Sequence, residues 1–270
     1  MGIRLMKTIR AIIKLILLLA SGLMLFYFDL LILILFYPFS KITSRRISAF
    51  CGPFWGKLFT KILHIRIDVK GIENYQPGQN YCLVSNHMSY LDILIMAAVF
   101  PTLFVSRHDV KYWPLLGTIA WIRGAIFVDR TITGTQQKPH INKIVNYLQN
   151  GLNVLIFPEG KTSNGESVLP FKKTIFSCPV KAGAAILPIT NRYTFIDGEP
   201  FSEHNRDRVC WYGGMTFLDH IWNVLKLRKF EVVLTIHPPV YEPAEEDWLE
   251  QARNLSEKIH DIIEKSYFEL

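Results

Sequence analysis

Residues 81–92 read Tyr-Cys-Leu-Val-Ser-Asn-His-Met-Ser-Tyr-Leu-Asp, a short apolar segment that ends in a run of polar residues. The apolar part, Tyr81–Ser85, follows the turn Gln76-Pro77-Gly78 and is typical of a buried strand. The apolar run Leu91–Val99 predicts a helix directly after it. In α/β folds, functional side chains collect where such strands end. We therefore expect the polar residues between Ser85 and Leu91 to lie at the edge of a sheet.

The chain after residue 64 continues this alternation of apolar runs and amphipathic segments. Further strands are predicted at Ile65–Lys70, Thr102–Ser106, Ala125–Val128, Val154–Phe157, Ala185–Thr190 and Glu231–His237. Further helices are predicted near Gln137–Leu148, Lys172–Ala182, Leu218–Leu227 and Glu245–Tyr267. Short apolar strands that alternate with helices predict the α/β class, with a mixed, largely parallel sheet flanked by helices.

The N-terminal segment Ala11–Pro38 is almost wholly apolar and contains two charged residues, Lys14 and Asp29. About 20 apolar residues suffice to span a bilayer as a helix, and no signal-peptide cleavage site is evident. A carboxylate in hydrocarbon is costly, so Asp29 is also compatible with a bend between two half-inserted helices. A single span and a re-entrant hairpin both stay open. The segment Lys57–Leu63 reads equally well as an interfacial helix or as a buried core helix.

Composition narrows the class of protein. The chain has 270 residues, a formal net charge of +7, and 13% aromatic residues, which excludes a disordered polymer. Its four cysteines form no C-x-x-C pair, so we expect neither a zinc site nor a disulfide framework. The basic balance favours anionic partners. Because the chain lacks nucleic-acid-binding motifs and has an apolar N-terminus, we expect a membrane and no nucleic acid.

His87 and Asp92 are the residues with the clearest chemical meaning. A histidine can act as a general base near neutral pH, and a carboxylate can orient its ring and stabilise its charged form. Positions five apart lie roughly 140° from each other around a helix, so the side chains meet only if His87 lies in the loop before the helix. Ser89 is then a candidate N-cap, with Asp92 at N3. A capping box with an unrelated loop histidine is the alternative interpretation.

Two further strand ends carry polar groups. Phe157-Pro158-Glu159-Gly160 follows the strand predicted at 154–157, and Arg130 ends the segment Gly124–Arg130. A glycine permits close approach of a ligand, and a guanidinium suits a phosphate. A plain turn and a solvated arginine are the alternatives. A phosphate-binding P-loop is excluded, because Leu155 stands where that motif needs glycine.

Taken together and in this order, these segments resemble the glycerolipid acyltransferases of the 1-acylglycerol-3-phosphate acyltransferase type. The resemblance covers Ile65 to Val240. The matching segments are His87 with Asp92 (H-x4-D), Pro114-Leu115-Leu116-Gly117, Gly124–Arg130, Phe157–Gly160 and Ala185–Ile189. On this division, residues 1–64 form a membrane anchor with an interfacial helix, and residues 65–270 form the acyltransferase domain.

The resemblance implies an O-acyltransferase. His87 would be the general base on a lysophospholipid hydroxyl that attacks an acyl thioester, either acyl-CoA or acyl-acyl carrier protein, and Asp92 would orient His87. Arg130, Glu159 and Gly160 would bind the polar head of the acceptor. The remaining expected substrate-binding residues are Asn86, Lys161 and Lys172. No metal and no cofactor other than the acyl-thioester co-substrate is implied.

The sequence departs from the family pattern at Thr162, where relatives often have arginine, and at Thr174, where many have glycine. Lys161, next to Thr162, supplies a positive charge, but its ammonium cannot form the paired hydrogen bonds of an arginine guanidinium. This variant block resembles a bacterial subgroup that includes lyso-ornithine-lipid acyltransferases. We favour 1-acylglycerol-3-phosphate as acceptor, giving phosphatidic acid, with a lyso-aminolipid as the alternative.

A non-catalytic membrane lipid-binding protein is the rival from a different class. Four basic residues flank the apolar segment on each side, so charge alone does not orient it. The expected location is the inner, cytoplasmic membrane, with the active site facing the cytoplasm.

Overall fold

The structure is a computed structural model that describes residues 2–113, 115–129, 138–243 and 247–269. Its strands form one sheet in the order β1-β8-β6-β2-β5-β3-β4, with β7 paired to β6. The strands are β1 Ile65–Lys70, β2 Tyr81–Ser85, β3 Leu103–Arg107, β4 Ile126–Val128, β5 Val154–Ile156, β6 Ala185–Ile196, β7 Glu199–Pro200 and β8 Phe230–Ile236.

The sheet is mixed and largely parallel, which confirms the predicted class. From β6 through β2, β5 and β3 to β4, every neighbouring pair is parallel. β8 is antiparallel to β6 and parallel to β1. Because β2, β5 and β6 run in the same direction side by side, their carboxyl ends meet at one edge of the sheet, and the candidate functional residues follow two of these ends.

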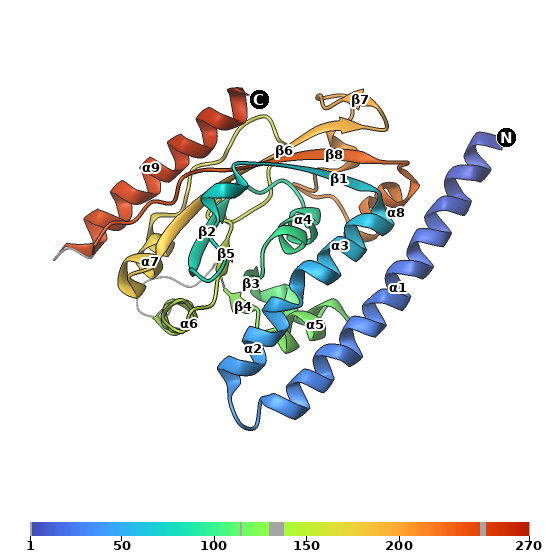
Figure 1. Ribbon diagram of the computed structural model, residues 1–270. Coiled ribbons are helices and arrows are strands. Elements are labelled where there is room, and N and C mark those ends of the chain that lie inside the picture. The colour runs from blue at the N-terminus through green and yellow to red at the C-terminus, as the bar shows by residue number, and fades with distance from the viewer. Residues whose placement is uncertain (1, 114, 130–137, 244–246, 270) are drawn as a thin grey trace.

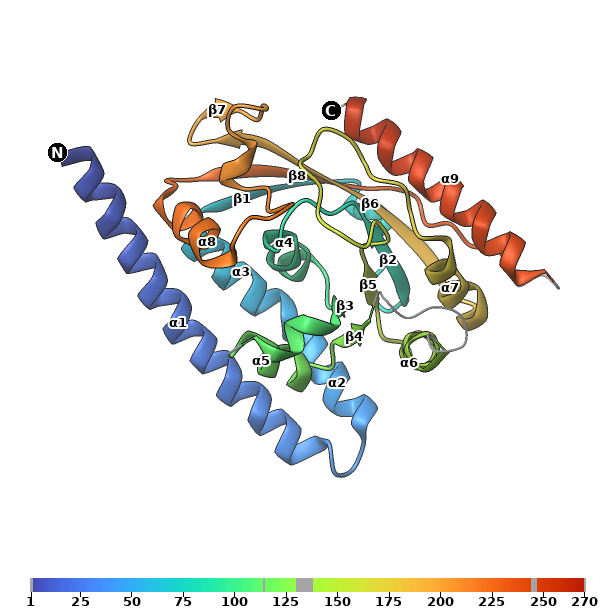
Figure 2. The same cartoon turned by 180° about the vertical axis from the view of Figure 1, so that it is seen from behind.

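Helices cover both faces of the sheet. They are α1 Gly2–Phe36, α2 Lys41–Phe50, α3 Gly52–Leu63, α4 Leu91–Val99, α5 Leu116–Ile122, α6 Lys138–Gln149, α7 Ser177–Ala182, α8 Phe217–Lys226 and α9 Trp248–Glu269. Figure 1 shows α4 and α3 between the sheet and the long helix α1. The view from behind, in Figure 2, shows α9 and α7 on the opposite side of the molecule from α1.

Two elements differ from the sequence expectation. β6 continues six residues beyond Thr190 to Ile196, because it pairs antiparallel with β8 over this stretch and so keeps its backbone hydrogen-bonded. The polar residues Asn191 and Arg192 hide this continuation in the sequence. The helix expected over Lys172–Ala182 is shorter: a 3-10 turn over Lys173–Phe176 precedes α7.

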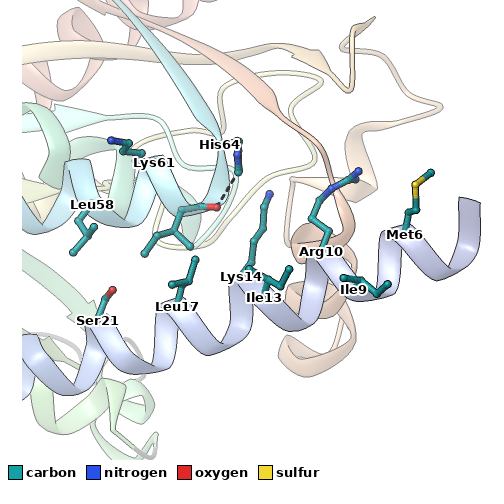
Figure 3. A pocket seen from close by; sticks show the side chains of 11 residues that line it. Met6, Ile9, Arg10, Ile13, Lys14, Leu17, Ser21, Leu58, Lys61 and His64 are labelled. Atoms are coloured by element: carbon teal, nitrogen blue, oxygen red, sulfur yellow. Dashed lines mark hydrogen bonds between the residues drawn. The ribbon is translucent and has the colours of Figure 1, made fainter.

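The first helix is continuous through Asp29, so a bend at that residue is wrong. One stripe of α1 faces the rest of the protein, and its buried members recur at intervals of three, four or seven residues: Ala11, Lys14, Ser21, Leu25, Asp29 and Ile32. This spacing is that of one helix face. Figure 3 shows Lys14 of this stripe pointing from α1 toward the C-terminal end of α3. Both charged residues of the apolar segment therefore point into the protein, and neither needs to be accommodated by lipid.

Each of these two charges makes specific bonds to the body of the protein. The Asp29 carboxylate has no exposed surface and lies 2.9 Å from Nη1 of Arg123, which follows α5. Arg123 also donates through Nη2 to the Ser48 carbonyl at 2.6 Å. Toward the other end of α1, the Lys14 ammonium donates to the carbonyls of Leu63 and Leu227, both at 2.9 Å. These bonds attach α1 to the body of the protein at two separated points.

The remaining faces of α1 expose large apolar side chains along the whole helix, among them Ile16, Met24 and Ile34. Among the described residues, α1 is the one helix long and apolar enough to cross a membrane, judged by length and composition, over Arg4–Phe36. A helix that is apolar all round and only partly buried by protein is typical of contact with lipid.

Helix α3 packs closely on α4. A Cβ added to Gly56 would lie only 2.3 Å from the backbone nitrogen of Ala98, so only glycine allows this approach. Trp55, Thr60 and Leu63 are buried on the same helix, whereas Lys57 and Lys61 are exposed. One face of this segment is therefore a core helix with a charged edge, and the interfacial position of its exposed face stays a prediction. α3, which belongs to the predicted anchor region 1–64, thus contributes to the packing of the sheet domain.

The buried ion pair between α1 and Arg123 leads to a stability prediction. Asp29→Leu leaves the Arg123 guanidinium without its carboxylate, and we expect the free energy of unfolding to fall by about 2–4 kcal/mol. The double variant Asp29→Leu/Arg123→Met removes both charges and should recover most of this loss. Thermal unfolding of the full chain in detergent micelles measures both.

The exposed pair between Lys173 and Glu257 provides the control, since surface pairs contribute little. Glu257→Gln should leave the unfolding temperature nearly unchanged. A single Asp29→Leu variant as stable as the unaltered chain would contradict the role of the Asp29–Arg123 pair.

Candidate active site

His87 and Asp92 lie together at the carboxyl end of β2. His87 is in the loop that follows the strand, and Asp92 is in the first turn of α4. The imidazole Nδ1 donates to Asp92 Oδ2 at 2.8 Å. This is the arrangement that the five-residue spacing requires if the two side chains are to meet.

Asp92 is fully buried, and hydrogen bonds surround its carboxylate. Oδ2 also accepts the backbone N–H groups of Met88 at 2.7 Å and Ser89 at 2.9 Å. Oδ1 accepts the hydroxyl of Tyr193 at 2.7 Å. These donors replace the water that a buried carboxylate has lost, and they hold both oxygens in one orientation.

The expected cap of α4 is wrong in its details. The N-cap position is Tyr90, and no side-chain hydrogen bond caps the helix there. Asp92 therefore occupies N2 rather than N3. The physical reason is that the Asp92 carboxylate takes the free N–H groups of the loop itself, so the Ser89 side chain is not needed as a cap.

The imidazole of His87 is held on a second side by an aromatic ring. It stacks on Phe157, with ring centroids 3.9 Å apart and an interplanar angle of 10°. The side chain keeps 12% of its surface exposed. Because Nδ1 faces the carboxylate, Nε2 is the ring nitrogen turned to the open side, and no described residue forms a hydrogen bond to it. The open nitrogen can take a proton from a bound hydroxyl.

Asn86, which is expected to bind substrate, uses its side chain to bond the neighbouring strand β6. Its side chain is 2% exposed. The amide donates to the Asn191 carbonyl and accepts the Asn191 N–H, both at 2.8 Å. These two bonds extend the parallel pairing of β2 with β6 by one residue. The side chain thus fixes the start of the His87 loop, and a contact of Asn86 with the substrate stays a prediction.

The Glu159 side chain contacts the backbone of the loop that contains His87. Its Oε1 accepts the backbone N–H of His87 at 2.8 Å, and only 5% of the residue is exposed. Burial raises the pKa of this carboxyl from its ordinary value of 4.5 to about 8, although the nearby N–H groups of His87 and Leu169 oppose the shift. The backbone of Ser163 donates to the His87 carbonyl at 2.8 Å. The segment after β5 therefore holds the His87 backbone from both sides.

Gly160 has a left-handed backbone with φ +73°, and a Cβ there would lie 2.7 Å from Cε of Lys172. The left-handed conformation favours glycine here, whereas the flexible end of Lys172 could move to make room for a Cβ. The side chains of Lys172 and Lys161 are exposed near this turn. Arg130 and Pro114 lie outside the described residues. Binding of an acceptor head by Arg130, Glu159, Gly160, Lys161 and Lys172 stays a prediction.

Three residues that support the loop were not found from the sequence. Tyr193 binds Asp92, the Trp211 N–H donates to the Met88 carbonyl at 2.9 Å, and the Tyr267 hydroxyl donates to the Gly165 carbonyl at 2.6 Å. Extending the predicted strand at 185–190 by four residues would have placed Tyr193 at the same sheet edge. The other two contacts are long-range and have no local signal. Among the described residues, no group of three or more His, Cys, Asp or Glu side chains could hold a metal ion.

The raised pKa of Glu159 predicts how stability depends on pH. Between the ordinary pKa of 4.5 and the folded-state value of about 8, the folded chain holds a proton that the unfolded chain has released. The free energy of unfolding therefore falls as the pH rises through this window, by up to a few kcal/mol. Glu159→Gln keeps the acceptor for the His87 N–H but does not titrate. We expect it to flatten this dependence and to be the more stable protein near pH 8.

Unfolding curves at about pH 5.5 and pH 8 test this expectation, with the exposed residue change Glu203→Gln as the matched control. Parallel pH dependence of the unaltered chain and the Glu159→Gln variant would show that Glu159 is ionised in the fold.

Comparisons with known proteins agree with this site. A family model described as Acyltransferase matches residues 66–192, which include the His87–Asp92 pair and the Glu159 turn. A lyso-ornithine lipid O-acyltransferase of Brucella abortus is 28% identical over 220 residues, 79% of this chain and 81% of the relative. A 1-acyl-sn-glycerol-3-phosphate acyltransferase of Neisseria gonorrhoeae is 30% identical over 166 residues, 60% of this chain and 62% of the relative.

The crystal structure of the 1-acyl-sn-glycerophosphate acyltransferase PlsC from Thermotoga maritima has the same fold, with a TM-score of 0.61. It covers 95% of this chain and 97% of its own, at 22% sequence identity. The fold, the matched segment and the relatives agree with one another: the chain contains an acyltransferase domain over residues 66–192 and is an acyltransferase.

Proposed function

We propose that this acyltransferase moves a fatty acyl group from an acyl thioester to the free hydroxyl of a lysophospholipid. The preferred acceptor is 1-acylglycerol-3-phosphate, and the product is then phosphatidic acid. The observation that carries this proposal is the His87–Asp92 pair at the carboxyl edge of the sheet, with Nδ1 bound to a buried carboxylate and Nε2 on the open side.

In the proposed reaction, Nε2 of His87 takes the proton of the acceptor hydroxyl as its oxygen attacks the thioester carbonyl. The carbon–sulfur bond then breaks, the thiolate leaves, and the proton returns from His87 to the sulfur. Asp92 keeps Nδ1 protonated and stabilises the imidazolium between the two steps. The thioester is already activated, so the reaction needs neither a covalent enzyme intermediate nor a metal or cofactor.

The basic residues around the Glu159 turn support an anionic acceptor. Lys161 and Lys172 are exposed, and the Lys172 side chain lies against Gly160. Arg130, two residues after β4 in the sequence, lies outside the described residues and is the third candidate cation. A phosphate suits such a group of cations. Relatives of both kinds, however, match this chain, and Thr162 replaces an arginine common in the family. A lyso-ornithine lipid or another lyso-aminolipid is therefore the second candidate acceptor.

The apolar helix α1 supports a location at the membrane. We propose that it anchors the enzyme in the inner, cytoplasmic membrane, with the site facing the cytoplasm, where acyl-CoA and acyl-acyl carrier protein are available. Residues 1–64 would supply the anchor and residues 65–270 the acyltransferase domain. Helix α3 belongs to residues 1–64 but packs on α4 of the acyltransferase domain.

Replacement of the proposed base tests the reaction. His87→Ala should lower the turnover of acyl transfer by about 10²–10⁴, the usual contribution of a general base. The measurement is transfer of a labelled acyl group from acyl-CoA to 1-acylglycerol-3-phosphate by the full chain. His204→Ala, at a histidine whose side chain is 87% exposed, is the control and should be fully active. If folded His87→Ala turned over normally, a non-catalytic lipid-binding protein would become the better reading.

The acceptor is identified by a direct competition. Offering 1-acylglycerol-3-phosphate and lyso-ornithine lipid at equal concentration should give mainly phosphatidic acid. A predominance of acylated ornithine lipid would instead favour the second candidate, without affecting the proposed role of His87.

Tyr193 is expected to act as a positioning residue for Asp92. Tyr193→Phe removes one hydrogen bond to a buried carboxylate, an interaction worth about 1.5–3 kcal/mol. We expect kcat to fall roughly ten- to a hundredfold, since each 1.4 kcal/mol is a factor of ten, and KM for the acceptor to change little. Tyr212→Phe, whose hydroxyl bonds Asp207 near the surface, is the matched control. An unchanged kcat in Tyr193→Phe would mean that the other three donors suffice.

A further inference from the structure

Helix α9 is fixed to the body of the protein along one face. Its buried side chains recur every four residues and include Leu255, Ile259, Ile263 and Tyr267. The Ile263 carbonyl accepts the hydroxyl of Thr190 on β6 at 3.3 Å. The ring of His260 lies edge-on to Phe171, in the segment between β5 and α7, with ring centroids 5.0 Å apart. The helix is therefore attached both to the sheet and to the segment that follows β5.

Tyr267, in the last turn of α9, reaches the loops of the candidate active site. It is 4% exposed, and its hydroxyl donates to the Gly165 carbonyl at 2.6 Å. The same hydroxyl lies 3.5 Å from Sδ of Met88, the residue after His87. A phenol has one proton, and the shorter bond to the carbonyl takes it. Figures 1 and 2 both show the end of α9 beside the segment between β5 and α7.

Two observations keep this hydroxyl in place as a donor. Burial raises its pKa, so the phenol keeps its proton near neutral pH. From β6, the guanidinium carbon of Arg192 lies 5.7 Å from the centre of the Tyr267 ring, which is the distance of a cation–π contact.

Gly165 belongs to a short turn that holds the backbone of His87. The turn is closed by the Gly165 N–H, which donates to Ser163 Oγ at 3.3 Å, and the Ser163 N–H donates to the His87 carbonyl at 2.8 Å. A Cβ at Gly165 would lie 3.2 Å from Sδ of Met88, so the turn packs directly against the His87 loop. The atom that α9 holds and the atom that holds His87 are thus two residues apart in one turn.

We propose that Tyr267 is a positioning residue for acyl transfer, through which α9 keeps the Gly165 turn against the His87 loop. This role rests on the proposed function of His87. Two bonds hold the His87 backbone, one from Glu159 and one from Ser163, and the second depends on the position of the turn. A general base is effective only while it stays within hydrogen-bond reach of the reacting hydroxyl. Tyr267 itself is buried and acts through the loop.

Removal of the hydroxyl tests this role. Tyr267→Phe keeps the ring and its packing but loses the bond to Gly165. We expect kcat for acyl transfer by the full chain to fall about three- to tenfold, with little change in KM for acyl-CoA or for 1-acylglycerol-3-phosphate. The Ser163 amide should also exchange faster with deuterium. An unchanged kcat would overturn the proposal, as would a loss that lies only in the KM of the acceptor.

Tyr75→Phe is the matched control. Its hydroxyl accepts a bond from Asn153 Nδ2 at 3.3 Å, and Asn153 directly precedes β5, at the opposite edge of the sheet from His87. This variant also removes a hydroxyl that is hydrogen-bonded inside the protein, and we expect it to lower the unfolding temperature by a similar amount and to leave kcat unchanged. An equal fall of kcat in both variants would indicate general loosening of the fold and overturn the role of Tyr267.

A double variant shows whether Tyr267 acts through His87. In His87→Ala/Tyr267→Phe, the residual transfer should be as fast as in His87→Ala alone, because there is no base left to position. A further three- to tenfold fall would mean that Tyr267 acts independently of His87, and it would overturn the proposal. A slow His87→Ala with a fully active Tyr267→Phe rejects only the role of Tyr267, whereas a fully active His87→Ala rejects the proposed function and this role with it.

Discussion

Asp92 carries a carboxylate with no exposed surface, and such a charge is stable only where hydrogen-bond donors replace the water it has lost. The four donors come from three places: the His87 ring, the loop N–H groups of Met88 and Ser89, and the Tyr193 hydroxyl on β6. The carboxylate therefore joins the loop after β2, the start of α4 and the neighbouring strand. If one of these elements moved, a donor would be lost in a region that water does not enter.

Glu159 and Asn86 stabilise the same loop from the other direction. Both side chains bond backbone groups, Glu159 the His87 N–H and Asn86 the backbone N–H and carbonyl of Asn191. A conformation held by so many bonds presents Nε2 of His87 at one position, and a general base is effective only when it is held within reach of the reacting hydroxyl.

The sequence alone predicted those features of the fold and the site that depend on residues close together in the chain. The apolar run Tyr81–Ser85 and the five-residue spacing from His87 to Asp92 predicted a strand, a loop and a helix in the order and geometry observed. The sequence did not predict the contacts that join segments far apart in the chain. Tyr193 binds Asp92 from 101 residues away, and Tyr267 binds Gly165, in the segment after β5, from 102 residues away. The burial of Asp29 likewise depends on its ion pair with Arg123, 94 residues later, and no residue near Asp29 in the sequence indicates that partner.

Lys14 and Asp29, the two charged residues of the apolar segment in α1, bind the protein near opposite edges of the sheet. Lys14 binds the Leu63 carbonyl just before β1, and Asp29 binds Arg123 just before β4, and β1 and β4 are the terminal strands in the sheet order. Fifteen residues of helix rise roughly 22 Å. Six strand spacings amount to roughly 29 Å, so the two attachment points are separated by a distance comparable to most of the width of the sheet. A helix attached in this way cannot turn independently of the sheet. An α1 that lies in the bilayer would therefore set the direction in which the carboxyl ends of the strands, and His87 with them, face.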